Sequence, residues 1–206
     1  MSASKGFILV VEDIAAVREL VEVQLSLRGH SVRTARDGQD ALDVIAAEGV
    51  PALVVSDILM PRMDGFVLAH RLRREASTAQ VPIIFLSATY VSAEDERFAL
   101  TLGALRFLAK PVDTDELFKA VTEALNGHTV AGVLLTEREF YTGYRQRLET
   151  KLRQKSEQVT RSRQQSASLP PGQRENYERT LADAQNQYDE IQRELAVLNT
   201  VLQGLK

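Results

Sequence analysis

One stretch in the first half of the chain constrains the fold most strongly. Residues 53–57 read Leu-Val-Val-Ser-Asp, an apolar and β-branched run that predicts a buried strand ending in a carboxylate. Residues 58–66 then carry proline and glycine, which are typical of a turn, before a helical pattern begins. Asp57 is therefore expected at the mouth of a parallel sheet, where open α/β sheets bind ligands. Because aspartate also ends many ordinary strands, the residues at the other strand ends are needed to tell whether Asp57 has a function.

Apolar runs alternate with helical patterns over the first 126 residues. Further strands are predicted at residues 7–11, 31–35, 82–87 and 105–109. Helices are predicted at residues 14–28, from Asp37 to the glycine at 49, and at 64–75, 93–102 and 113–126. Five strands alternating with five helices predict an α/β fold, a doubly wound parallel sheet with helices on both faces, because right-handed crossovers place them there.

The carboxyl ends of all strands in such a sheet lie on one rim. The polar residues at these ends are Glu12, Asp13, Asp57, Ser87 and Lys110. Singly, each has an ordinary reading as a helix cap, a turn residue or a solvated charge. Together, three crowded carboxylates would repel one another unless a hard cation such as Mg²⁺ lay among them. The set predicts a pocket where one carboxylate accepts a phosphoryl group while Mg²⁺, the lysine and the hydroxyl neutralise its oxygens.

Composition limits the alternatives. The chain has 206 residues, 44% of them hydrophobic, which is enough for a core. It has no cysteine, which excludes disulfides, thiol chemistry and zinc held by thiolates. No apolar run reaches the roughly 18 residues that a membrane-spanning helix needs, and no signal peptide is evident. We expect a soluble, cytoplasmic protein with no membrane partner.

Residues 1–126 resemble the response-regulator receiver domain of bacterial two-component signalling. The matching motifs are Glu12-Asp13, Asp57-x-x-Met60-Pro61-x-Met63-Asp64-Gly65, Leu86-Ser87-Ala88 and Gly103-Ala104-x-x-Phe107-Leu108-x-Lys110-Pro111. The resemblance implies a flavodoxin-like fold with strand order 2-1-3-4-5. It also implies a phosphoacceptor in a phosphorelay, modified on Asp57 by a histidine kinase or phosphotransfer protein, that is not an enzyme acting on other substrates.

The resemblance also assigns the metal and phosphoryl ligands. Asp13, Asp57 and the backbone carbonyl of Leu59 would bind Mg²⁺ (or Mn²⁺), with Glu12 contributing through water. Lys110 would pair with the phosphoryl group, and the bond to its following proline is expected to be cis. Glu12 stands where the family more often has aspartate, and its extra methylene should shift metal binding without abolishing it.

Two residues of the resemblance carry the switch. A phosphoryl group would draw Ser87 toward it, and Phe107 would then turn inward into the vacated space. This movement would repack the face made by the fourth helix, fifth strand and fifth helix. Ser87 stands where threonine is frequent and keeps the hydroxyl.

The second part of the chain has a different pattern. After a linker at residues 127–132, residues 133–206 predict two long helices broken by Leu-Pro-Pro-Gly at 169–172, which form an antiparallel coiled-coil hairpin. The predicted seam consists of Tyr141, Tyr144, Leu148, Leu152, Tyr188, Ile191, Leu195, Leu198 and Leu202, with Tyr177, Leu181, Ala184 and Leu205 extending it. Basic residues predominate in the first of these helices and acidic residues in the second, which favours their pairing.

A two-helix hairpin has little core, so its apolar seam needs another surface. A second copy would complete a four-helix bundle, which makes a homodimer our leading expectation. The alternatives are that the hairpin binds a partner or folds onto its own receiver part. DNA binding is disfavoured because a helix-turn-helix uses short helices. Two functions remain: a phosphorylation-gated signalling protein, or a constitutive coiled-coil adaptor whose receiver part serves for docking or as a phosphate sink.

Overall fold

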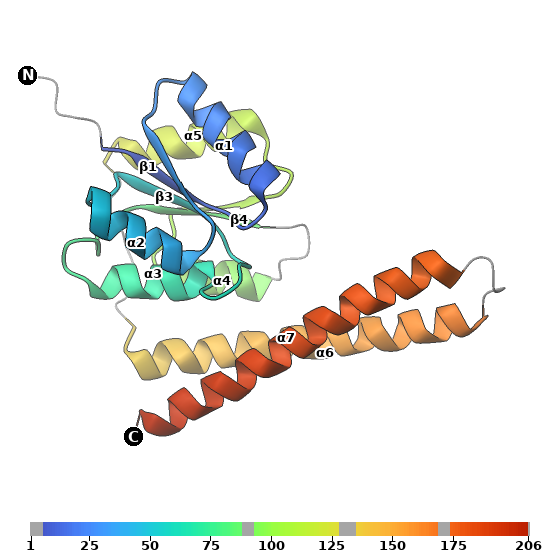
Figure 1. Cartoon of the computed structure of the whole chain (residues 1–206). Coiled ribbons are helices and arrows are strands. Elements are labelled where there is room, and N and C mark those ends of the chain that lie inside the picture. Colours follow the sequence, from blue (N-terminus) through green and yellow to red (C-terminus); the bar gives the residue numbers. More distant parts are fainter. Residues whose placement is uncertain (1–5, 88–92, 128–134, 169–173, 206) are drawn as a thin grey trace, which may run out of the picture. The chain divides into compact units, whose positions relative to one another are not determined.

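The computed structural model describes residues 6–87, 93–127, 135–168 and 174–205 (Figure 1). The chain divides into two compact units, Met1–Leu134 and Leu135–Lys206. Most of the predicted linker, residues 127–132, lies outside the described residues, so its boundaries stay a prediction. Within the described ranges, no helix is both long and apolar enough to cross a membrane.

The first unit contains all the predicted strands and the five helices that alternate with them. The strands are β1 (Ile8–Val11), β2 (Val32–Ala35), β3 (Leu53–Asp57), β4 (Ile83–Ser87) and β5 (Arg106–Ala109). The helices of this unit are α1 (Ala15–Leu27), α2 (Gly38–Glu48), α3 (Gly65–Arg74), α4 (Ala93–Thr101) and α5 (Thr114–Leu125).

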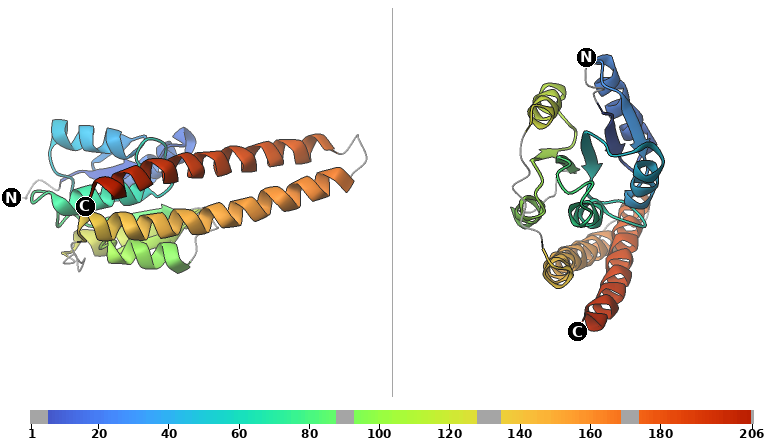
Figure 2. Two further views of the ribbon diagram at one scale, coloured as in Figure 1. Left: turned by 90° about the horizontal axis from the view of Figure 1, so that it is seen from below. Right: turned by 90° about the vertical axis from the view of Figure 1, so that its left-hand side faces the viewer.

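These elements form the predicted flavodoxin-like fold. All strands are parallel and lie in the order β2-β1-β3-β4-β5, so the expected order 2-1-3-4-5 is confirmed. Helices α1 and α5 cover one face of the sheet, and α2, α3 and α4 cover the other (Figures 1 and 2). The three central strands are buried along their whole length, as expected of a parallel sheet between two helical layers.

Aspartate caps begin three of the helices. Asp37 accepts hydrogen bonds from the backbone amides of Gln39 and Asp40 at the start of α2. Asp64 does the same for α3, and Asp113 for α5. Each side chain satisfies amides that lack a partner within the helix, which fixes where the helix starts and how the preceding loop enters it.

The apolar pattern of α1 extends beyond its buried face. Val21 and Leu25 are buried, as the helical spacing predicts. Ile14 and Leu20, which follow the same helical spacing in the sequence, are instead 56% and 57% exposed. With Val23 and Leu27, at 54% and 82%, they leave α1 with apolar side chains exposed along its length. We refer to these four residues as the α1 surface.

A buried arginine ties together three segments beside the sheet. Arg73 on α3 donates hydrogen bonds to the carbonyls of Ala79 and Val81, in the connection to β4. It also donates to the carbonyls of Leu102 and Gly103, at the carboxyl end of α4. Burial lowers the pKa of Arg73 to about 10, so the guanidinium is still charged at neutral pH. A cation at the negative end of the α4 dipole holds that end of the helix in place.

The second unit is a pair of long helices, α6 (Glu137–Ser168) and α7 (Arg174–Gly204), which lie side by side (Figure 2). The Tyr144 hydroxyl donates to Glu194, and Arg163 Nη2 donates to Gln185 Oε1 over 2.8 Å. Residues near the start of α6 thus contact residues near the end of α7, so the two helices run antiparallel.

The predicted seam residues occupy the inner face of this pair. Tyr144, Leu148, Leu195 and Leu198 are buried. Tyr141, Leu152, Leu181, Tyr188, Ile191, Leu202 and Leu205 are half-buried, and Ala184 is buried, whereas the side chain of Tyr177 lies outside the described residues. On α7, the positions between seam residues are exposed from Ala182 onward, except for the half-buried Gln185. The heptad spacing therefore identifies the face of α7 that is covered.

Candidate functional site

Three carboxylates meet at the carboxyl rim of the sheet. Glu12 and Asp13 follow β1 directly, and Asp57 is the last residue of β3, the neighbouring strand. Each offers a carboxylate oxygen, and these oxygens all lie within 4.8 Å of one another. Glu12 is fully buried, Asp57 is 8% exposed and Asp13 is exposed. The strand register therefore brings together acids that are 45 residues apart in the sequence.

Lys110, the residue directly after β5, completes this group. The peptide bond from Lys110 to Pro111 is cis, as expected. The Lys110 Nζ atom lies 2.5 Å from Glu12 Oε2 and 3.0 Å from Asp57 Oδ2. One ammonium at the end of β5 thus bridges two of the three acids, which lie at the ends of β1 and β3.

The rim holds more negative charge than this lysine can neutralise. Burial raises the pKa of Asp57, and the Asp13 charge adds to the effect, although Lys110 and the Ile58 amide oppose it. Burial likewise raises the pKa of Glu12 against the hydrogen bond from Lys110. Both shifts mean that the ionised carboxylates are held at a free-energy cost, which a cation among them would lower.

The donor set fits a hard divalent cation. Carboxylate oxygens are the ligands that Mg²⁺ prefers, and the exposed Asp13 leaves the cluster open to solvent on one side, where waters or phosphate oxygens could supply further ligands. Leu59, whose carbonyl the resemblance adds to the ligands, lies two residues after Asp57 with its side chain 55% exposed. The residues present therefore suit Mg²⁺.

The two expected switch residues lie on strands next to this cluster. Ser87 ends β4 and is 3% exposed, and its carbonyl accepts the Lys110 backbone amide at 2.5 Å. Phe107 is half-buried on β5, opposite Phe85 in the register of the sheet. Ala88, the last residue of its motif, lies outside the described residues. The structure therefore places both residues on the strands beside the cluster, and their coupling stays a prediction.

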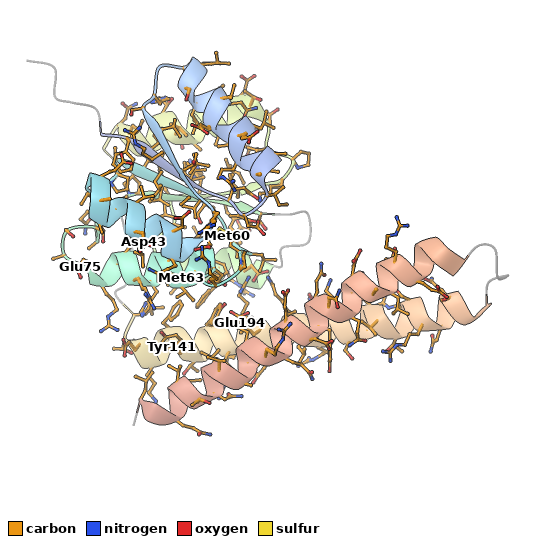
Figure 3. All side chains as sticks on the ribbon, viewed as in Figure 1. Asp43, Met60, Met63, Glu75, Tyr141 and Glu194 are labelled. Atoms are coloured by element: carbon orange, nitrogen blue, oxygen red, sulfur yellow. The ribbon has the colours of Figure 1, made fainter. Side chains whose placement is uncertain are left out.

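A tight loop leads from Asp57, at the end of β3, into α3. The Gly65 amide donates to the Ile58 carbonyl over 2.9 Å and closes the loop at its base. A Cβ atom on Gly65 would lie 2.2 Å from the Asp57 carbonyl oxygen. Met60 and Met63 extend from this loop (Figure 3), and both are buried. The glycine of the Asp-Gly motif is therefore required by the close approach of α3 to the end of β3.

Sequence reasoning missed the arginines that support this site. Arg18, on the first turns of α1, donates from Nη1 to the Glu12 carbonyl over 2.6 Å and to the Asp13 carbonyl over 3.4 Å. Arg62, in the loop after Asp57, pairs with Asp37. Their spacing shows no pattern, because each contact depends on how separate loops come together in the fold.

Comparisons with known proteins agree with this geometry. Residues 8–122 match the family model described as "Response regulator receiver domain". The chain is 40% identical over 117 residues to the "Probable transcriptional regulator ycf27" of Cyanophora paradoxa, covering 57% of this chain and 47% of that protein. It is 37% identical over 115 residues to the "Response regulator PleD" of Caulobacter vibrioides, covering 55% and 25% respectively. The chain thus spans about half or less of the length of these relatives.

Solved structures give the same result. A putative response regulator from Chloroflexus aurantiacus J-10-fl superposes with a TM-score of 0.56 at 31% identity, covering 60% of this chain and all of that one. The chemotaxis response regulator CheY4 of Vibrio cholerae superposes with a TM-score of 0.54 at 30% identity, covering 59% of this chain and all of that one. The family match covers more than half of the chain and contains the whole acidic cluster. The chain therefore belongs to the response regulator receiver family.

Proposed function

We propose that this protein is a two-component response regulator that accepts a phosphoryl group on Asp57 and passes the signal on through the α6–α7 hairpin. The observation that carries the proposal is the arrangement at the rim: three carboxylate oxygens within 4.8 Å of one another, with the Lys110 ammonium 3.0 Å from Asp57 Oδ2. Asp57 is buried enough to be shielded from bulk water and still has an 11% exposed side chain, which leaves an edge open for attack.

The chemistry is a transfer between a phosphorylated imidazole and a carboxylate. An Asp57 oxygen attacks phosphorus, the N–P bond of the donor histidine breaks, and its electron pair stays on the ring nitrogen, which takes up a proton. Lys110 and the Ser87 hydroxyl balance charge on the phosphoryl oxygens. Asp13, Asp57 and the Leu59 carbonyl, with Glu12 through water, would hold Mg²⁺ or Mn²⁺, which would supply charge neutralisation when bound. Catalysis is limited to the protein's own phosphorylation and dephosphorylation, so we do not propose an enzyme that acts on other substrates.

The α1 surface supports a protein as the phosphodonor. Helix α1 begins two residues after Asp13, with Ile14 exposed at its N-cap and Leu20, Val23 and Leu27 exposed farther along it from the rim that the donor must reach. Exposed apolar side chains that extend from a reactive group are typical of a docking surface. We infer that a histidine kinase or phosphotransfer protein binds there.

The exposed apolar residues of the hairpin support a signal output by self-association of the protein. Its half-buried seam leaves apolar area that two helices cannot cover, and Val197 and Val201 on α7 are 64% and 37% exposed. Helices of 32 and 31 residues are longer than those of a helix-turn-helix, and this length supports an output other than DNA binding. We infer that two copies pair through their hairpins into a four-helix bundle, in a cytoplasmic homodimer.

Phosphoryl incorporation tests the proposal. The full chain, incubated with acetyl phosphate and Mg²⁺, is expected to gain the mass of one phosphoryl group, and to gain none with EDTA or as Asp57→Asn. Asp43→Asn, on the exposed side of α2, is the matched control and should behave like the wild type. A phosphorylated histidine protein used as the donor in the same assay should be slowed by Leu20→Glu, which should leave the acetyl phosphate reaction unchanged. Full incorporation into Asp57→Asn would refute the assignment.

A further inference from the structure

The loop after the acceptor contains an unusual backbone conformation. Arg62 has a φ of 63°, and among the described residues it is the only one other than glycine with a positive φ. A side chain in this left-handed region costs roughly 1 kcal/mol, which contacts elsewhere must offset. Glycine would avoid that cost, so the arginine side chain is the place to look for the compensating contact.

The Arg62 guanidinium reaches a buried carboxylate on another loop. Its Nε donates to Asp37 Oδ2 over 2.6 Å, and its Nη2 also contacts that oxygen. The Asp37 side chain is 1% exposed, whereas that of Arg62 is 51% exposed. Burial acts to raise the pKa of Asp37, but the α2 amides and Arg62 outweigh it and hold that pKa below its ordinary value. Asp37 is therefore an ionised acid whose charge partner comes from the acceptor loop.

Two further contacts, a backbone hydrogen bond and a side-chain contact, join the same pair of loops. The Gly38 amide donates to the Met63 carbonyl over 2.9 Å. The Met63 side chain fills the space beside Gly38, where an added Cβ would lie 2.7 Å from Met63 Cγ. The β2–α2 loop thus contacts the acceptor loop at consecutive residues, 62 and 63. Figure 3 shows Met60 and Met63 extending from this acceptor loop.

These contacts fix the position of the segment that carries Leu59. The segment is closed at its base by the hydrogen bond from Gly65 to Ile58, and it is held on its other side through Arg62, three residues after Leu59. Without the ion pair, only the hydrogen bond from the Met63 amide to the Pro61 carbonyl, over 2.7 Å, would hold the turn at Arg62 locally among the described residues. We expect the backbone there to move toward negative φ, and the peptide planes between residues 59 and 62 to rotate with it.

We propose that Arg62 and Asp37 are a positioning pair that orients the Leu59 carbonyl toward the metal and phosphoryl group at Asp57. Neither residue touches the reacting atoms; the pair acts through the backbone of the acceptor loop. This inference rests on the proposed function, because the carbonyl has a role only if the rim binds a divalent cation. It adds a contribution from the β2–α2 side of the sheet to a site otherwise built from β1, β3, β4 and β5.

Mg²⁺ binding to the full-length protein, measured by calorimetry, tests the pair. Asp37→Asn removes the charge and keeps an oxygen for the α2 cap, and Arg62→Gly removes the ion pair while suiting a positive φ. Each variant is expected to raise the Kd for Mg²⁺ by about tenfold, the size of effect seen when an outer support of a metal ligand is lost. Arg62→Lys should recover part of the affinity, since one ammonium cannot reproduce two guanidinium contacts.

Controls separate positioning from general damage. Arg36→Ala removes the ion pair between the exposed Arg36 on the same β2–α2 loop and the half-buried Asp40 on α2, and should leave the Kd unchanged. At saturating Mg²⁺ the acetyl phosphate reaction of Arg62→Gly should return to the wild-type rate, which a generally disordered site would not show. If wild type binds Mg²⁺ and both pair variants bind it within about twofold of wild type, the inference is wrong. If wild type itself fails to bind Mg²⁺, the proposed function fails instead.

Discussion

Gly65→Ala is expected to reduce the free energy of unfolding of the first unit by at least about 3 kcal/mol, since overpacking against rigid backbone is among the costliest point changes. The added methyl carbon would lie 2.2 Å from the Asp57 carbonyl oxygen and 3.1 Å from both Phe85 and the Ser56 hydroxyl. Neither the β3 backbone nor the buried Phe85 ring can move away without disturbing the sheet. The end of β3 must shift, and Asp57 shifts with it.

Urea unfolding followed by circular dichroism measures this loss. Phosphoryl incorporation from acetyl phosphate should fall in the same variant, because the proposed acceptor Asp57 would no longer align with the proposed metal ligands. Gly204→Ala is the control for adding a methyl group, since nothing lies within 4 Å of a Cβ there, and it should be neutral or slightly stabilising. A Gly65→Ala protein as stable and as reactive as the wild type would show that the loop is free to move away from β3.

Arg73→Met is expected to be the second most damaging change, with a loss of about 3 kcal/mol or more. Methionine retains much of the apolar stem but leaves four carbonyl groups without the guanidinium that now binds them. Hydrogen bonds from a charged donor contribute about 1.5–3 kcal/mol each, although their effects do not add fully. The carboxyl end of α4 should loosen first, because Leu102 and Gly103 both lose their donor.

The matched control for this variant is Arg71→Met. Arg71 is an exposed residue in the same last turn of α3, and its replacement should cost less than about 0.5 kcal/mol. Hydrogen exchange at the α4 amides would locate the effect as well as its size. A stability loss no larger than that of Arg71→Met would mean that water replaces the guanidinium without penalty.

The rim residues were predictable because the carboxyl ends of all strands in a parallel sheet lie at the same edge. Once β1, β3, β4 and β5 are assigned, their carboxyl ends must lie together, and Glu12, Asp57, Ser87 and Lys110 follow from the strand boundaries alone. The order of the strands in the sheet was predicted from the family resemblance and not from the strand pattern. What these patterns do not contain is the electrostatic state of the rim, where Lys110 bridges two acids at hydrogen-bonding distance.

The contacts of Arg62 and Arg73 were not predictable from the sequence. Arg73 contacts carbonyls up to 30 residues away, and Arg62 contacts an acid 25 residues earlier. No periodicity relates such positions, because each pairing depends on the path of two loops. The α1 pattern failed for another reason: apolar residues lie on two sides of this helix, and spacing alone does not tell which side faces the sheet.

The hairpin shows what heptad spacing can and cannot give. It identified the covered face of α7, where Leu195 and Leu198 are buried. On α6 it missed one polar member, Ser162, which is buried; Lys155, which the spacing did include, is half-buried, with a pKa lowered by burial. Polar groups at seam positions weaken a two-helix pair and favour one register, which is consistent with a seam completed by a second copy.

Sedimentation equilibrium of the full-length protein in Mg²⁺, with and without beryllofluoride as a non-covalent phosphoryl mimic, tests most directly the central claim that the site at Asp57 governs the hairpin. The mimic is expected to change the association constant of the wild type by at least about fivefold, the lower end of ordinary coupling between two sites. It should leave Asp57→Asn unchanged. The same association constant for the wild type with and without the mimic would contradict the claim and identify the hairpin as a constitutive adaptor.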